Sequence, residues 1–205
     1  MPGVQFLRNV LLFSLAGLLP VLVLYVALSP GFATALADGG PALMRFLRQV
    51  LTNGLPVIMV VNYVGFLLFA LSHERSGSGR DPGTYIVVDF FSRLGLFVSL
   101  HALIYVVSAD WYGSFGGSPT TALRVVAPTL ARSALFENIS GVYLYATLVS
   151  AIPLYVSAVR RSPRLAPVIR FFPGPVGPVA FALLIFAAGA TCLTVLATIF
   201  VRLQA

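Results

Sequence analysis

The sequence contains few charged side chains and no lysine. Only 9% of the 205 residues are charged and 59% are hydrophobic, with a mean hydropathy of +0.96. Soluble domains carry about 25% charged residues, so this composition excludes that class. A helix needs about 20 apolar residues to cross the hydrocarbon core of a membrane, and five such helices use nearly the whole chain. We therefore predict an all-α, polytopic integral membrane protein, with residues 1–205 forming a single membrane domain.

The missing residue types exclude several kinds of chemistry. A Schiff base with retinal or pyridoxal phosphate requires a lysine amine, and all thirteen cationic residues are arginines. The single cysteine, Cys192, excludes an internal disulfide and an iron–sulfur cluster bound by this chain alone. The chain has six carboxylates and two histidines, and the HExxH, CxxC, GxSxG and P-loop patterns are absent. The sequence therefore predicts no catalytic residues, no metal site and no enzymatic activity.

Long apolar runs predict five membrane-spanning helices. They cover about residues 10–28, 50–71, 84–108, 141–159 and 177–201. Residues 29–44 are rich in Gly, Pro and Asp and are expected to form a loop. Residues 120–136 have apolar positions at helical spacing, with Arg124 and Arg132 away from them. This pattern predicts one amphipathic helix that lies along the membrane surface.

The net charge of +7 comes largely from arginines at the ends of the apolar runs. There, cationic residues set the topology and meet anionic headgroups, so we expect contact with membrane lipids and no binding of nucleic acid. The candidates for lipid or headgroup contact are Arg160, Arg161, Arg164 and Arg170 in the linker before the last run, and Trp111 in an aromatic belt. The arginine bias favours a bacterial inner membrane protein with a cytoplasmic amino terminus and a periplasmic carboxyl terminus.

The third apolar run carries two opposite charges, Asp89 and Arg93. On a helix they lie about 40° apart and one turn from each other, in the order that favours an ion pair. A charge near the bilayer midplane costs at least about 2.5–3.5 kcal/mol. We therefore expect the pair to face protein or water and to join this helix to a neighbour. A proton or ion pathway is the alternative.

The same run carries His101, about 80° around the helix from Arg93 and about 12 Å further along. The other histidine, His73, stands beyond the opposite end of the run, so a haem held between the two is not expected. His101 remains a candidate ligand of a pigment or haem, and the simpler interpretation is a histidine that is hydrogen-bonded inside the bundle. The candidate bound molecules are a lipid, a quinone or a pigment, and the sequence identifies no cofactor.

Two asparagines and one glycine are candidate contacts with other helices or subunits. Asn53 and Asn62 lie about 180° apart on a helix, so each is expected to hydrogen-bond a different neighbour. Gly189 belongs to the small-residue cluster AAGAT, which permits close helix packing. Prolines inside three of the runs predict kinks: Pro20, Pro56 and Pro153.

Together these features favour a non-catalytic accessory or scaffold subunit of a larger membrane complex. Polar residues on several helix faces and the small-residue cluster suit contact with other integral membrane subunits. A bioenergetic assembly, respiratory or photosynthetic, is one host that fits. The alternative is a small transporter or channel in which Asp89 and Arg93 form a polar pathway. A third hypothesis, an enzyme that acts on lipid or isoprenoid substrates, is supported only by the arginine-rich linker.

Overall fold

The computed structural model describes residues 3–74, 81–107, 118–172 and 174–204, which form helices joined by short turns. Five segments among them are long and apolar enough to span a membrane. Their bounds are Gly3–Leu28 (α1), Gly40–Ser72, Thr84–Val107 (α5), Ile139–Arg161 and Gly174–Gln204. The protein is an all-α polytopic membrane protein, as its composition predicts.

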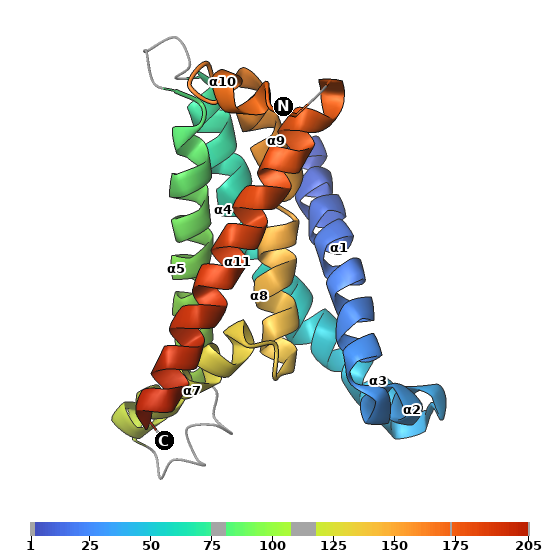
Figure 1. Cartoon of the computed structure of the whole chain (residues 1–205). Helices are drawn as coiled ribbons and strands as arrows, with labels where there is room; N and C mark the ends of the chain where they lie inside the picture. The colour runs from blue at the N-terminus through green and yellow to red at the C-terminus, as the bar shows by residue number, and fades with distance from the viewer. Residues whose placement is uncertain (1–2, 75–80, 108–117, 173, 205) are drawn as a thin grey trace.

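The segments form a bundle whose termini lie at opposite ends (Figure 1). The fourth segment, made of α8 (Ile139–Val149) and α9 (Ile152–Arg161), occupies the centre, and α8 packs against α1, α5 and α4 (Leu55–Glu74). The last helix, α11 (Gly177–Gln204), contacts α9 and, toward its carboxyl end, α7 (Pro119–Ala134) (Figure 1). In the most apolar stretch of the fourth segment 67% of the residues are buried, against 6% in that of the last segment. The last segment is therefore the least buried of the five spanning segments.

The prediction of a loop at residues 29–44 is wrong. The segment forms α2 (Pro30–Ala37) and the first half of α3 (Gly40–Gln49). Each helix has a proline in its first turn, where the missing N–H is not needed and the fixed φ suits a helix. Between them, Gly39 and Gly40 have φ angles of 71° and 70°, which glycine adopts without the clash of a Cβ. Residue types that are common in turns act here as helix start and stop signals.

Two of the spanning segments are irregular close to a proline. The second contains a π-helical stretch, η1 (Val50–Gly54), which ends two residues before Pro56. The fourth is broken at residues 150–151, just before Pro153. Proline lacks the N–H for an i→i−4 bond, and its ring clashes with the carbonyl of residue i−4. Pro20, by contrast, lies inside α1 without ending that helix.

α7 corresponds to the amphipathic helix predicted at residues 120–136 and lies at the end of the bundle near the carboxyl terminus (Figure 1). Val126 and Ala134 are buried, and Arg124 and Arg132 are exposed, as the pattern indicates. α7 packs against α5, α8 and α11. Its orientation along a membrane surface stays a prediction.

Candidate functional site

Asp89 and Arg93 form the ion pair that their spacing predicts. The Nε atom of Arg93 donates a hydrogen bond to Oδ2 of Asp89 at 2.6 Å. The exposed fractions of the two side chains are 0% for Asp89 and 1% for Arg93. The pair therefore faces the interior of the bundle, where protein shields both charges from hydrocarbon.

Arg93 also binds two neighbouring helices. Its Nη1 atom donates to the side-chain oxygen of Asn62 on α4 and, at 2.8 Å, to the carbonyl oxygen of Thr147 on α8. A guanidinium group presents five donors in one plane, so one side chain can bond several groups at once. The pair joins α5 to α4 and α8, as expected of a pair that ties its helix to its neighbours.

The break in the fourth segment makes the Thr147 carbonyl available to Arg93. In a continuous α-helix this oxygen would accept the N–H of Ala151. Instead, the N–H of Ala151 donates to the carbonyl of Leu148 at 3.1 Å. The Thr147 oxygen accepts from Arg93 and, at 2.9 Å, from the hydroxyl of Ser150. The irregular helix thus supplies an acceptor at the point where the buried cation lies.

Asn62 extends the network to α1. Its side-chain oxygen accepts from Arg93 and lies 2.7 Å from the hydroxyl of Ser150, whose single proton it shares with the Thr147 carbonyl. Its nitrogen donates to the hydroxyl of Ser14 at 2.9 Å, and Ser14 donates to the carbonyl of Val10 at 2.7 Å. Asn62 is fully buried, and these bonds remove the penalty that an unpaired buried amide would carry.

Gly65 on α4 provides the space that the ion pair occupies. A Cβ added to Gly65 would lie 2.1 Å from Nη2 of Arg93 and 2.8 Å from Oδ1 of Asp89. These two atoms have no hydrogen-bond partner among the described residues. The hydroxyl of Tyr85 donates to the Gly65 carbonyl at 3.2 Å, and the hydroxyls of Tyr85 and Tyr155 interact electrostatically with the Asp89 carboxylate. Charged, amide, hydroxyl and phenol groups from four spanning segments therefore form one polar network around Arg93.

His101 lies apart from this network, toward the α7 end of α5. Its ring is tilted against that of Phe97, with centroids 4.4 Å apart, and lies 5.8 Å from the ring of Tyr105. His101 is 6% exposed, and its imidazole makes no hydrogen bond to a described residue; Nδ1 is fully buried. The simpler expectation of a histidine hydrogen-bonded inside the bundle is therefore not met within the described residues.

A cavity of about 280 Å³ borders the imidazole of His101. Its wall comes from the end of α3, η1, α4, α5, α7 and α8. Its polar lining includes Gln49, Asn53, Thr129, Asn138 and Ser140. This combination of an unpaired imidazole and amide groups makes the cavity a candidate binding site.

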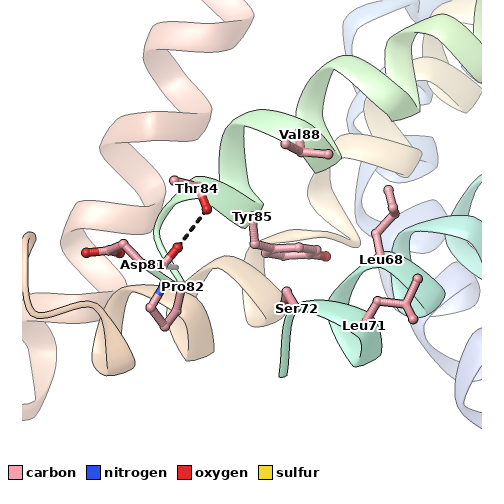
Figure 2. Close-up of a pocket in the computed structure, with 8 residues that line it drawn as sticks. All are labelled: Leu68, Leu71, Ser72, Asp81, Pro82, Thr84, Tyr85 and Val88. Atoms are coloured by element: carbon pink, nitrogen blue, oxygen red, sulfur yellow. Dashed lines mark hydrogen bonds between the residues drawn. The ribbon is translucent and has the colours of Figure 1, made fainter. Parts of the chain in front are cut away.

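A smaller cavity of about 170 Å³ lies at the other end of α5 (Figure 2). Leu68 and Leu71 of α4 line one side, and Val88 and Tyr85 of α5 line the other. Tyr85 reaches from this cavity to the carbonyl of Gly65. The phenol therefore connects the cavity wall to the polar network around Arg93.

Asp81 lies beside this smaller cavity and holds the start of α5 against the linker after α9 (Figure 2). Its carboxylate accepts the hydroxyl of Ser162 at 2.5 Å and the N–H of Gly83 at 2.6 Å. Burial by itself would raise the pKa of Asp81. The hydrogen bonds from Ser162, Gly83 and the Arg164 backbone, together with the Arg164 charge, outweigh it and hold this pKa below its ordinary value. Asp81 is therefore a structural carboxylate at the arginine-rich end.

The four arginines predicted to meet headgroups have different surroundings. The Nε atom of Arg164 lies 3.7 Å from Oδ2 of Asp81. The guanidinium of Arg161 lies over the ring of Phe69, 4.9 Å from its centroid. Arg160 and Arg170 are exposed. Headgroup contact stays a prediction for all four.

The remaining predicted contacts are placed as follows. Asn53 is exposed and accepts a hydrogen bond from the hydroxyl of Thr52 at 3.1 Å, so its expected bond to a neighbouring helix is not present among the described residues. An added Cβ at Gly189 would lie 2.8 Å from the ring of Phe90. Gly189 thus packs closely against α5, whereas Ala187 and Thr191 of the same small-residue cluster are exposed. Trp111 lies outside the described residues.

The sequence does not identify six members of the network: Ser14, Gly65, Tyr85, Thr147, Ser150 and Tyr155. Serine, threonine and glycine are common in membrane helices, and their side chains often bond only their own backbone, so their presence in an apolar run carries little information. Pro153 provides the one usable signal. A proline in a spanning run implies freed carbonyls one turn earlier, near the residues that receive Arg93.

Known proteins provide no template for these sites, because no family model, curated protein or solved structure matches the chain. Within the described part of the chain, no three His, Cys, Asp or Glu side chains gather as metal ligands. The two polar regions differ in chemistry. The network around Arg93 is enclosed and is bonded within itself except at Oδ1 of Asp89, Nη2 of Arg93 and the Tyr155 hydroxyl, whereas the imidazole of His101 lies beside a cavity that a molecule can enter.

Proposed function

We propose that the protein is a non-catalytic accessory subunit that scaffolds a larger membrane complex. Its partners are other integral membrane subunits, which contact it through α11, and membrane lipids. The observation that carries this proposal is the exposure of α11. The helix runs from Gly177 to Gln204, yet its buried residues are Gly177, Pro178, Ala182 and Ala197.

The exposed surface of α11 suits a partner helix. Ala187, Thr191, Thr194 and Thr198 lie within about 60° of one another around the helix axis. Small residues let helix backbones approach closely, and the three threonine hydroxyls already bond carbonyls of their own helix at 2.8–2.9 Å. A cavity of about 350 Å³ adjoins this surface, between α11, α8 and α1. Close packing there would leave no polar group of these threonines unpaired.

The network around Arg93 supports a scaffold rather than the alternative of a transport pathway. Asp89 and Arg93 have exposed fractions of 0% and 1%, and the cation is bonded to Asp89, Asn62 and the Thr147 carbonyl. A group that carries protons or ions needs contact with water along the pathway. An enclosed network instead fixes the relative positions of α1, α4, α5 and α8, which a scaffold requires.

The arginine distribution supports a specific orientation in a bacterial inner membrane. In the sequence, seven arginines flank the predicted spans on the side of the amino terminus: Arg8, Arg75, Arg80, Arg160, Arg161, Arg164 and Arg170. The other side has five, Arg45, Arg48, Arg124, Arg132 and Arg202, which Asp38, Asp110 and Glu137 partly offset. Positive residues accumulate on the cytoplasmic side. We therefore place the amino terminus in the cytoplasm and the carboxyl terminus in the periplasm.

Cys192 offers a direct test, because it is the single cysteine of the chain and is exposed on α11. A photoreactive maleimide attached to Cys192 in native membranes should cross-link one defined partner. Extraction in mild detergent should then yield that partner in fixed stoichiometry. An absorption spectrum of the product would reveal a bioenergetic host by its haem or pigment.

The matched control moves the cysteine to another lipid-accessible position, with Cys192→Ser combined with Leu19→Cys on α1, where Leu19 is 57% exposed. The control should label equally well without cross-linking the same partner. A monodisperse, partner-free protein after mild extraction, together with no cross-link from Cys192, contradicts the proposal.

A further inference from the structure

We infer that the cavity beside His101 binds the carbonyl group of a neutral, membrane-soluble molecule, supplied by a quinone ring or by the ester of a glycerolipid. This inference does not depend on the proposed scaffold function. It rests on the unpaired donors of the cavity, on its lack of charge and on its position near one end of the bundle.

The imidazole of His101 is the first observation. The residue is 6% exposed and hydrogen-bonds no described residue, and Nδ1 is completely buried. A neutral imidazole carries one N–H donor and one acceptor nitrogen, and a buried polar atom without a partner is destabilising. Nδ1 has no accessible surface and so does not face the cavity. His101 lines the cavity, and a bound molecule there is positioned to complete the hydrogen bonding of the other ring nitrogen, Nε2.

The amide of Asn53 is the second unpaired donor. Its oxygen lies 3.1 Å from the Thr52 hydroxyl, whose single proton also faces the Arg48 carbonyl at 2.8 Å. Its nitrogen makes no hydrogen bond to a described residue. Asn138 differs, because its oxygen accepts from Ser133 and from the Gly141 N–H, and its nitrogen donates to Thr129. The donors left for a ligand include the Asn53 amide and the His101 imidazole, and the side chains of Gln49 and Ser140 in the same lining also hydrogen-bond no described residue. Donors select an acceptor, and a carbonyl oxygen can accept two hydrogen bonds.

The lining also limits the charge of the ligand. No charged side chain is among the described residues that border the cavity, and an uncompensated charge is costly to bury. Val57, Ile104 and Ile139 supply apolar wall. The site therefore fits a neutral molecule with a polar head and an apolar body.

The site lies at a depth in the membrane that suits the polar head of a membrane-soluble molecule. His101 precedes the end of α5 at Val107 by six residues, or about 9 Å. A hollow of about 480 Å³ adjoins the cavity and shares Gln49, Asn138 and Ile139 with it. This hollow provides access from the surface of the bundle.

The test uses the full-length protein in nanodiscs and a benzoquinone with one isoprenoid unit as the probe. Protein labelled with ¹⁵N-histidine gives imidazole signals from His101 and His73. In nanodiscs made of diether lipids, which lack ester carbonyls, the probe should shift the His101 signals and leave those of His73 unchanged. Titration of this shift gives the affinity.

Two variants then identify the donors. His101→Phe keeps a ring against Phe97 and removes both nitrogens, and it should weaken binding, measured by calorimetry, by about tenfold or more. Asn53→Leu, at an exposed position, should weaken binding several-fold without unfolding the protein. Ser72→Ala, in the lining of the cavity at the other end of α5, should bind as the wild type does.

Diester nanodiscs distinguish the two sources of the carbonyl. Unchanged quinone affinity there identifies a quinone site. Weaker quinone affinity, with an ester lipid that co-purifies with the wild type but not with His101→Phe, identifies a lipid site. Either result supports the inference. It is overturned if neither molecule binds the folded wild type, if both variants bind normally, or if the purified protein carries a tetrapyrrole absorption band that His101→Phe removes.

Discussion

The Nη1 atom of Arg93 lies 2.8 Å from the carbonyl oxygen of Thr147, a residue 54 positions later in the chain. The bond joins the third and fourth spanning segments at the point where the fourth is irregular. With the bonds to Asp89 and Asn62, it makes one buried cation the common contact of three segments. The stability of the bundle should therefore depend on this side chain more than on any single apolar contact.

Removal of the cation should be severe because it leaves an uncompensated buried carboxylate. Arg93→Leu should lower the free energy of unfolding by about 3–5 kcal/mol. The double variant Asp89→Leu/Arg93→Leu removes both charges and should be less destabilised than Arg93→Leu alone. Reversible unfolding of the purified protein in mixed micelles gives both values. If the double variant loses as much free energy of unfolding as Arg93→Leu, or more, the two residues do not act as a pair.

Glycine at position 65 should be needed for space, whereas glycine at 95 should not. In Gly65→Ala the new methyl group would meet Nη2 of Arg93 at 2.1 Å, so the pair must move and the free energy of unfolding should fall. The matched control is Gly95→Ala in α5, where nothing lies within 4 Å of the added Cβ. It should be neutral or stabilising by up to about 1 kcal/mol. Similar effects at both positions would contradict the packing of the pair against Gly65.

Replacement of Pro153 should be unfavourable although it removes a helix breaker. In Pro153→Ala the helix can become continuous, and the Ala151 N–H would compete with Arg93 for the Thr147 carbonyl. We expect a loss of about 1 kcal/mol in the free energy of unfolding, the value of a typical hydrogen bond. Pro20→Ala, inside α1, is the control and should not destabilise. A more stable Pro153→Ala protein would show that the break has no role in binding Arg93.

Asp81 should make the stability depend on acid pH. Its pKa in the folded protein is held below the ordinary value of 3.8, so the ionised carboxylate stabilises the fold. This stabilisation is complete above the ordinary pKa and is lost as the pH falls through the lowered value. Asp81→Asn should therefore melt at a lower temperature than the wild type at neutral pH, and the difference should shrink in acid. A difference that does not change with pH would remove Asp81 from this role.

The spanning helices and the ion pair could be predicted because their signals are local. An apolar run of about 20 residues has few alternatives to a membrane helix. Asp89 and Arg93 are four residues apart, so helix geometry alone places them together. The enclosed position follows from the cost of charge in hydrocarbon. Each of these inferences needs only one helix.

The partners of the pair could not be predicted, because they depend on how helices pack. The sequence shows that Asn62 is polar, but its bonds to Ser14, Ser150 and Arg93 depend on the relative rotation of four segments. Asn53, with the same side chain nine residues earlier, is exposed. The prediction of a loop at residues 29–44 is wrong for another reason, because proline and glycine mark helix ends as well as turns.

The order of the network along the chain also bears on how the protein is made. Synthesis proceeds from the amino terminus, so Ser14 and Asn62 are in the membrane before Arg93 emerges. Asp89 emerges four residues ahead of Arg93 and can neutralise it during insertion of α5. The Thr147 carbonyl, which accepts from Arg93, and the Ser150 hydroxyl, which bonds Asn62, arrive last, with the fourth segment. Insertion of the fourth segment is therefore the step that locks the first four segments together, and α11 joins an assembly that is already closed.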